Sequence, residues 1–222
     1  MKFSYASHKE IQLNPGKITT LGTYSSVVYT ELIQGMQGLN EQIRVFDDEY
    51  NECPLNKSID WCGDIGCRTI EVNQYLTKLE RLISESLTDE DRNQIHDCLS
   101  KLYSAVEQQL FLTDLPLEVT YDFDMKHLLK FAKIHFDEKW QTNPYDIIES
   151  ILKVHQECDI ESCVVLTNVT HYLTASQMHE LEDSVVATGQ SLLLLEFCKM
   201  DQRDYYDVGS FNFIDEDFVD WY

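Results

Sequence analysis

The sequence predicts an α/β fold built around a parallel sheet. Two short apolar runs, at residues 163–168 and 191–197, enclose an amphipathic segment at 174–187, and a helical pattern that opens at Asn143-Pro144 precedes them. Strands that are covered on both faces lose the polar alternation of half-exposed strands, so apolar runs of this length are typical of parallel strands. The order therefore predicts a helix followed by a strand-helix-strand crossover unit.

Local signals mark the ends of these two helices. Asn143 suits the N-cap of a helix that has Pro144 at its first position. Thr174 and Gln177 have the reciprocal spacing of a capping box, and Gly189 suits the end of the second helix. Four apolar residues of that helix have helical spacing and are expected to face the sheet: Met178, Leu181, Val185 and Val186.

The first 70 residues predict short strands and one helix. The expected strands are 2–5, 10–13, 17–21, 42–46 and 58–62, and the expected helix is 24–36. Asn14-Pro15-Gly16 is a turn signal between the second and third strands. The chain is therefore expected to begin with a small antiparallel arrangement.

The middle of the chain predicts helices. Apolar residues keep helical spacing from Glu71 and again from Ile95 to Leu110. Between them, Thr88-Asp-Glu-Asp91 offers an N-cap and acids that suit the positive end of the second helix. We expect two long antiparallel helices here and a shorter helix at 125–134.

Composition indicates a folded protein of a reducing compartment. The 222 residues are 43% hydrophobic, which is enough for a substantial core, and the seven cysteines are an odd number scattered along the chain. No apolar run approaches the roughly 20 residues that span a bilayer, and the first residues lack the apolar segment of a secretory signal. The sequence therefore predicts a soluble, cytoplasmic protein without a membrane segment.

The charge balance is strongly acidic. The chain has 39 Asp and Glu against 17 Lys and Arg, a formal net charge of −22. Affinity for nucleic acid comes mostly from Lys and Arg that release counterions, so this balance argues against such a partner. Two arrangements would overcome it: basic residues clustered on one face, or divalent cations bound to the carboxylates.

One acidic segment has a spacing that suits a cation. Glu118, Asp122 and Asp124 supply hard oxygen ligands close together in sequence, and calcium takes 6 to 8 oxygens in flexible geometry. The twelve-residue pattern of an EF-hand is absent. The alternative is a solvated loop with a helix N-cap.

A basic stripe follows directly. Lys126, Lys130 and Lys133 fall at i, i+4 and i+7 and would share one face of the expected helix. They are the densest cluster of positive charge and the best candidate for a surface that faces phosphates. A solvated helix face is the ordinary alternative.

Catalytic signatures are absent from the sequence. Gly16-Lys17 is not part of a phosphate loop, because Ile11 stands where its first Gly is required and Ile18 where its Ser or Thr is required. His179-Glu180 lacks the second His of a zinc protease. A nucleotide hydrolase is therefore not supported by any motif, and we expect a protein that is not an enzyme.

Five segments of the second half of the chain have a distinctive order and spacing: Tyr145-Asp-Ile-Ile-Glu-Ser-Ile-Leu152, Val164-Val-Leu-Thr-Asn168, Tyr172-Leu-Thr174, Leu193-Leu-Leu-Glu196 and Phe213-Ile-Asp-Glu-Asp-Phe218. In this order and spacing the chain resembles the Csn-two family of spacer-acquisition proteins from type II-A CRISPR systems. The upstream half is compatible through residues 43–47, Asp64-Ile65 and the helices at 71–111.

The resemblance implies a particular architecture and role. The head, residues 1–70 and 141–222, would be a degenerate nucleotide-hydrolase-like α/β domain, and residues 71–140 would form an elongated helical leg. A calcium-dependent homotetrameric ring would hold double-stranded DNA, especially linear ends, without reading its sequence, and would serve spacer acquisition in antiviral defence. The implied protein partners are the CRISPR adaptation integrase complex and the RNA-guided effector nuclease.

The resemblance also implies a role for one carboxylate. Glu118 matches the Glu of the Leu-Glu motif in the family's calcium-binding acidic loop, whereas at Asp122 and Asp124 this chain departs from the family's acidic run. Four chains would carry 4 × (−22) = −88 formal charges, so the implied calcium would have to neutralise acidic loops. The alternative is an acidic scaffold that binds proteins and no DNA.

Overall fold

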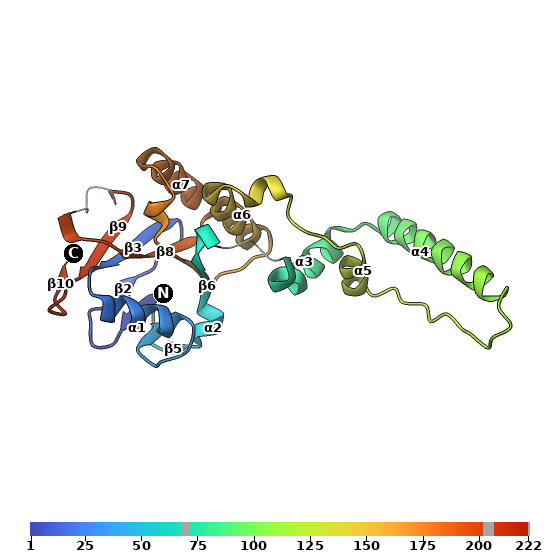
Figure 1. The fold of residues 1–222 in the computed structure, drawn as a ribbon, viewed down its shortest axis with the longest axis horizontal. Helices are drawn as coiled ribbons and strands as arrows, with labels where there is room; N and C mark the ends of the chain where they lie inside the picture. The colour runs from blue at the N-terminus through green and yellow to red at the C-terminus, as the bar shows by residue number, and fades with distance from the viewer. Residues whose placement is uncertain (68–71, 202–206, 222) are drawn as a thin grey trace. The chain divides into compact units, whose positions relative to one another are not determined.

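A computed structural model describes residues 1–67, 72–201 and 207–221 (Figure 1). The chain folds into two compact units. The head unit comprises Met1–Ile70 and Asp137–Tyr222, and the helical unit comprises Glu71–Phe136. Glu71, where the first helix of the middle region was expected to begin, lies outside the described residues.

The head unit contains a six-stranded sheet in the order β10-β9-β3-β8-β7-β6. Within the described residues, β3, β6, β7, β8 and β9 are parallel and β10 is antiparallel to β9. The predicted α/β class with a parallel sheet is therefore confirmed. The strands are β3 Lys17–Thr23, β6 Ile59–Asp64, β7 Cys163–Thr167, β8 Ser191–Phe197, β9 Ser210–Ile214 and β10 Asp220–Trp221.

The predicted crossover unit is present as β7, α7 (Ala175–Thr188) and β8, and the two strands pair in parallel. The capping box forms, because Thr174 Oγ1 accepts a hydrogen bond from Gln177 N–H and Gln177 Oε1 accepts one from Thr174 N–H. Gly189 ends the helix in the left-handed region.

One apolar residue of α7 does not face the sheet. Met178, Leu181 and Val185 are buried, whereas Val186 is 62% exposed. Val186 follows Val185 by about 100° around the helix, which places it beyond the buried stripe. The prediction that it belongs to the apolar face is wrong.

The helix before β7 is α6, Pro144–Glu157. Asn143 caps it, since its side chain accepts a hydrogen bond from Tyr145 N–H at 3.1 Å, and Pro144 occupies the first turn as predicted. The buried residues of α6 are apolar except for His155, whose Nε2 lies 2.8 Å from Asp60 Oδ2: Ile147, Ile148, Ile151, Leu152, Val154 and His155.

A second, antiparallel sheet has the order β2-β1-β4-β5. Its strands are β1 Lys2–Tyr5, β2 Ile11–Gln12, β4 Ile43–Phe46 and β5 Glu52–Cys53. The strand predicted at 17–21 is not part of it, because β3 leaves after Gly16 and becomes a central parallel strand. All of β3 after Lys17 is buried, which a strand at the centre of a covered sheet requires.

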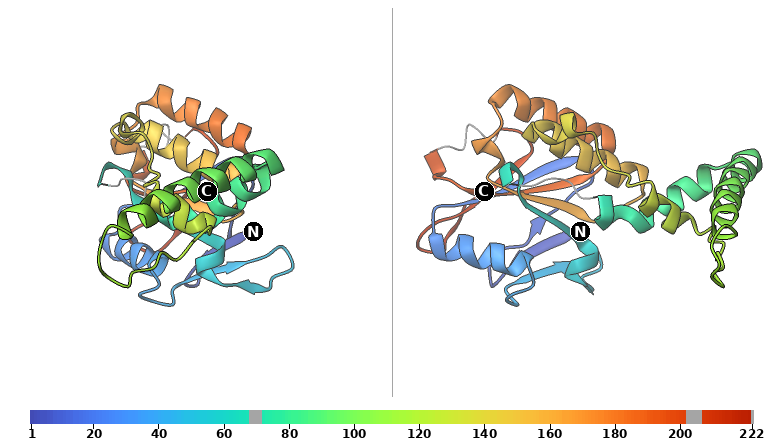
Figure 2. Two further views of the ribbon diagram at one scale, coloured as in Figure 1. Left: turned by 90° about the vertical axis from the view of Figure 1, so that its right-hand side faces the viewer. Right: turned by 45° about the vertical axis from the view of Figure 1, so that its right-hand side comes forward.

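The head unit has helices on both faces of its large sheet (Figures 1 and 2). Helices α6 and α7 cover one face, and α1 (Ser26–Met36) covers the other together with the antiparallel sheet. Short helical turns complete the unit: α2 Leu55–Ser58, η1 Ile65–Cys67, η2 Glu138–Gln141 and η3 Val169–His171. The core between the two sheets includes Phe3, Val28, Leu32, Leu193 and Leu195.

The helical unit contains α3 (Val72–Ser86), α4 (Asp89–Leu110) and α5 (Met125–Phe131). Thr88 caps α4 in a capping box with Asp91, as predicted for this segment. Helix α3 packs on α5, and Tyr75 and Leu76 of α3 and Leu129 of α5 are buried. The prediction that the two long helices form an antiparallel pair is wrong, since α3 lies against α5 and hardly contacts α4.

No helix of the described residues is both long and apolar enough to cross a bilayer. The cysteines at positions 53, 62, 98, 158, 163 and 198 are thiols and not disulfides. Four of these side chains are buried and pack as small apolar groups.

Candidate nucleic-acid interface

Ligands of parallel α/β sheets usually bind at the carboxyl ends of the strands. At this edge β3 is joined to α1 through Tyr24 and Ser25. Ser25 Oγ accepts a hydrogen bond from Val28 N–H at 3.4 Å, and Ser25 N–H donates to Thr23 Oγ1 at 3.1 Å. This connection has only two residues, and Ser25 already caps α1. It therefore has no room for the Gly-rich turn that surrounds a phosphate group.

The neighbouring strand places a carboxylate at the same edge. Glu196 is 1% exposed and accepts hydrogen bonds from Val169 N–H at 2.7 Å and Thr170 Oγ1–H at 2.8 Å. These donors compensate the burial of a polar group that would otherwise be costly. The carboxyl group of Glu196 therefore occupies donors at this edge that could otherwise bind a phosphate group.

Asn168 forms further hydrogen bonds between the segments at the carboxyl ends of the strands. It adopts the left-handed region at φ 52°, where its Oδ1 accepts from Phe197 N–H at 3.1 Å and its Nδ2 donates to Tyr29 Oη at 2.7 Å. Burial raises the pKa of Tyr29. The polar groups at the strand ends are therefore bonded to one another.

In the helical unit, the segment after Pro116 returns along α4. Tyr103 Oη donates to Asp122 O at 2.8 Å and accepts from Asp122 N–H at 3.0 Å. Tyr121 Oη donates to Glu107 Oε2 at 3.0 Å, which raises the pKa of Tyr121. Phe123 stacks on His96 with ring centroids 4.4 Å apart. Aromatic side chains thus fasten the acidic segment to α4.

The three predicted metal ligands lie in this segment and have different partners. Asp122 Oδ1 accepts from Asp124 N–H at 2.9 Å, and Asp122 Oδ2 lies 2.6 Å from His127 Nδ1; these two contacts lower the pKa of Asp122. Asp124 caps α5, because its Oδ1 accepts from Lys126 N–H at 2.8 Å. Glu118 is exposed and lines an open hollow beside Leu110 and Phe111.

These carboxylates do not form a metal cluster within one chain. Among the residues that the structure describes, no three His, Cys, Asp or Glu side chains come close enough to hold an ion. Glu118 is therefore not grouped with Asp122 and Asp124. Calcium takes 6 to 8 oxygens, so a site here would need main-chain carbonyls or a second copy of the chain. The calcium site stays a prediction.

The predicted basic stripe is shorter than expected. Lys126 and Lys130 lie one turn apart on α5, but this helix ends at Phe131. Lys133 has φ 51°, and its N–H donates to Lys130 O in the turn that ends the helix. The prediction of a helix to Ile134 is therefore wrong, and Lys133 lies outside the helical face. A DNA contact by each of the three lysines stays a prediction.

Positive charge is concentrated in the sequence of the helical unit. Residues 71–136 contain 7 Lys and Arg against 12 Asp and Glu, a net charge of −5, whereas the remaining residues contain 10 against 27, a net charge of −17. The helical unit is thus the part of the chain that least repels a phosphate backbone.

The aromatic attachment of the acidic segment was not predicted. Its signal is visible in the sequence, because Val119, Tyr121 and Phe123 alternate with polar residues and indicate an extended segment with one apolar side. The sequence does not indicate that this side meets His96 and Tyr103 of α4.

The sequence profile of the family described as "CRISPR-associated protein (Cas_Csn2)" matches residues 37–218. Among solved structures, the chain is similar to Stu0660 of Streptococcus thermophilus, with 12% identity and a TM-score of 0.58 over 100% of this chain and 76% of that one. A putative ATP-binding protein of an ABC transporter from Pyrococcus furiosus has 10% identity and a TM-score of 0.39 over 96% of this chain and 97% of that one, which is too low to carry an argument.

No curated protein matches the chain. The likeness to Stu0660, at 12% identity, shows the fold alone. The family match rests on the sequence, and it extends through most of the head unit and all of the helical unit. The chain therefore belongs to the Cas_Csn2 family of CRISPR-associated proteins.

Proposed function

We propose that this protein is a non-catalytic, sequence-independent binder of double-stranded DNA that works as a homotetrameric ring in CRISPR spacer acquisition. Family membership supports the CRISPR role. The observation that carries the DNA proposal is the pair Lys126 and Lys130, one turn apart on the unit with the least negative charge. Contacts of such lysines to phosphates position a duplex without reading its bases.

The surface of α4 supports the self-assembly part of the proposal. Helix α4 has 22 residues, and the structure describes no buried residue among them. Leu102 and Val106 are 46% and 43% exposed. Helices in proteins gain most of their stability by packing an apolar face against other parts of the structure. A second copy of the chain would supply the missing cover for the stripe of Ile95, Leu99, Leu102, Val106 and Leu110.

In the proposed ring, calcium would bind at a site that one chain does not complete by its side chains alone. The family resemblance implies it, and the carboxylates of Glu118, Asp122 and Asp124 have the right chemistry without forming a cluster in one chain. Main-chain oxygens or a second copy would have to complete the set. A bound divalent cation would reduce the negative charge that opposes DNA.

The test is a gel-shift titration of linear and covalently closed duplex DNA with the double variant Lys126→Ala/Lys130→Ala. If four copies each lose two phosphate contacts, the log-log salt slope falls by roughly 7 at about 0.9 per contact, and affinity drops by more than tenfold at low salt. Lys57→Ala/Lys139→Ala in the head unit removes the same charge from exposed positions and serves as the matched control.

Each titration is run with calcium and with chelator, and the mass is measured by light scattering. Calcium-dependent binding of linear ends by a species of four 25.9 kDa chains supports the ring. Duplex affinity that is equal in the wild type and both variants would remove α5 from the interface. A protein that ignores DNA and calcium alike would favour the acidic protein-binding scaffold.

A further inference from the structure

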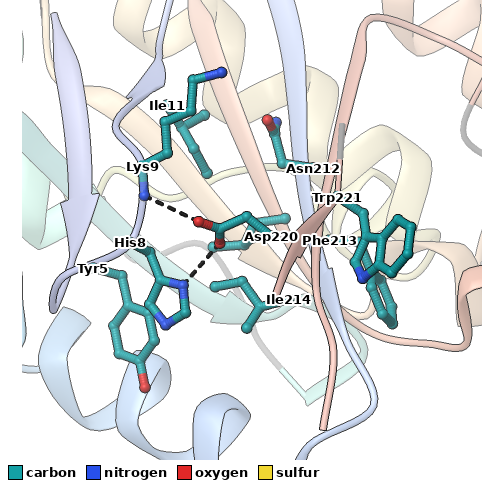
Figure 3. A pocket seen from close by; sticks show the side chains of 10 residues that line it. Tyr5, His8, Lys9, Ile11, Asn212, Phe213, Ile214, Asp220 and Trp221 are labelled. Carbon is teal, nitrogen blue, oxygen red and sulfur yellow. Dashed lines mark hydrogen bonds and ion pairs between the residues drawn. The ribbon is translucent and has the colours of Figure 1, made fainter. Parts of the chain in front are cut away.

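The last strand of the head unit is fastened by a carboxylate that joins the two ends of the chain (Figure 3). β10 is two residues long and pairs with β9. Asp220 Oδ1 lies 2.8 Å from His8 Nδ1, and Asp220 Oδ2 accepts a hydrogen bond from Lys9 N–H at 3.2 Å. One side chain thus ties β10 to two consecutive residues of the segment that follows β1.

The imidazole of His8 is held in a fixed orientation. Its ring stacks on Tyr5, with centroids 5.2 Å apart and planes 8° apart, and on Phe218, with centroids 6.4 Å apart. The His8 side chain is 10% exposed and that of Asp220 is 28% exposed. Packing therefore aims Nδ1 at the carboxylate, and both side chains remain partly in contact with solvent.

The turn before β10 has its own carboxylate. Asp215 Oδ2 accepts from Trp221 Nε1–H at 2.8 Å, and Asp215 Oδ1 accepts from Val219 N–H at 2.8 Å and Asp217 N–H at 3.0 Å. These bonds, the one from Trp221 first, hold the pKa of Asp215 below its usual range. Asp215 therefore stays ionised at every pH at which a histidine titrates, and the turn keeps its shape.

We propose that His8 and Asp220 form a pH-sensitive clasp that fastens the C-terminal segment, residues 215–221, to the connection between β1 and β2 of the antiparallel sheet. With His8 protonated the contact is a charge-assisted hydrogen bond, which is about twice as strong as the neutral bond that remains after deprotonation. Histidine is the side chain that ordinarily changes charge between about pH 5 and 8, so we expect the clasp to be stronger at the acidic end of that range.

The other ionisable groups around His8 are a tyrosine, a lysine and carboxylates. Tyr5 and Lys9 line the pocket with Asp220, and Tyr5 Oη donates to Glu31 Oε2 at 2.6 Å. Burial and the bond to Glu31 raise the pKa of Tyr5. Lysine and carboxylate side chains ordinarily keep their charges between about pH 5.5 and 8.5, whereas histidine is the side-chain type that ordinarily changes charge there.

The clasp holds a group of exposed apolar side chains in place. Phe218, Val219 and Trp221 are each about half exposed on the C-terminal segment, at 51%, 48% and 49%. Phe218 adopts φ 61°, a region that aromatic residues seldom occupy, so the turn presents its ring in a constrained way. A closed clasp fixes these three side chains, and an open clasp frees them and opens the pocket that Trp221 and Asp220 line with Tyr5.

The experiment is hydrogen exchange of the intact protein at about pH 5.5 and 8.5, with rates corrected for intrinsic chemical exchange. We expect protection of the amides of residues 215–221 to fall about fivefold across this range in the wild type. His8→Phe keeps the ring stack and removes the Nδ1 contact, so its protection should be low at both pH values. His171→Phe replaces an exposed histidine of the same unit and should behave as the wild type.

A second variant keeps the test decisive if His8→Phe folds poorly. Asp220→Asn retains an acceptor for Lys9 N–H but carries no charge, so its C-terminal segment should show partial protection without the pH dependence. Loss of the pH dependence in both variants supports the clasp. A wild-type pH dependence that persists in Asp220→Asn, or a wild-type C-terminal segment whose protection is independent of pH, would overturn it.

Discussion

Single carboxylates determine much of the local structure of this acidic chain. Asp215 organises a turn through three hydrogen bonds, and Glu196 is buried with two donors. Asp122 and Asp124 connect the acidic segment to α5. Many of the 39 acidic residues repel anions, but these four also have structural partners that a count of charges does not reveal.

Two glycines with similar backbone angles should differ sharply when substituted. Gly209 and Gly38 have φ 76° and 72°, but a Cβ at Gly209 would collide with Ile18 O, whereas a Cβ at Gly38 would meet no heavy atom within 4 Å. Gly38→Ala should cost only the left-handed strain, about 1 kcal/mol. Gly209→Ala should cost about 3 kcal/mol or more, because β3 and β9 must separate.

Urea denaturation measures both variants. Equal losses of unfolding free energy for Gly209→Ala and Gly38→Ala would contradict the close approach of Gly209 to β3.

At the scale of elements, the same capping motif occurs in two different settings. Thr174 caps α7, which buries Met178, Leu181 and Val185 against the sheet. Thr88 caps α4, which has no buried residue among those described. A cap contributes to global stability only where its helix is coupled to a core, so the setting decides the effect of losing it.

Thr174→Ala should lower the unfolding free energy of the head unit by about 1 kcal/mol. Thr88→Ala should leave that transition unchanged and accelerate hydrogen exchange in the first turn of α4. Denaturant titration followed by exchange mass spectrometry separates the two effects. A comparable loss of head-unit stability in Thr88→Ala would show that α4 is coupled to the head core.

At the scale of the whole molecule, the two units have different means of stabilisation. The head unit encloses a large core between two sheets and its helices. Among the residues described in the helical unit, only Tyr75, Leu76 and Leu129 are buried. Under the proposed assembly, the apolar stripe of α4 is the surface that another copy would cover.

Leu102→Glu/Val106→Glu should reduce the assembled mass, because charged side chains in an apolar contact carry a high desolvation cost. Light scattering at fixed concentration measures the effect. Asn93→Glu/Gln108→Glu adds the same charge on the opposite, exposed face of α4 and should leave the mass unchanged. An unchanged mass in both variants would exclude the α4 stripe from the assembly interface.

The sequence by itself determined the local elements with the strongest signals. The crossover unit of residues 163–197 was predicted because apolar runs, caps and Gly189 agree, and each of these depends on neighbours along the chain. The family resemblance was also visible in the sequence and is confirmed by the family match. The C-terminal end of α5 was predicted less well, because the left-handed residue after it is Lys133 and not the Gly that usually marks the end of a helix.

Only the tertiary structure decided which distant segments meet. β3 follows a turn signal like a third hairpin strand, yet its buried neighbours on both faces place it in the centre of the parallel sheet. His8 and Asp220 are 212 positions apart, and no local pattern pairs them. Whether Glu118 joins Asp122 and Asp124 likewise depends on how the chain returns along α4. Such contacts arise from packing between elements, which sequence spacing does not encode.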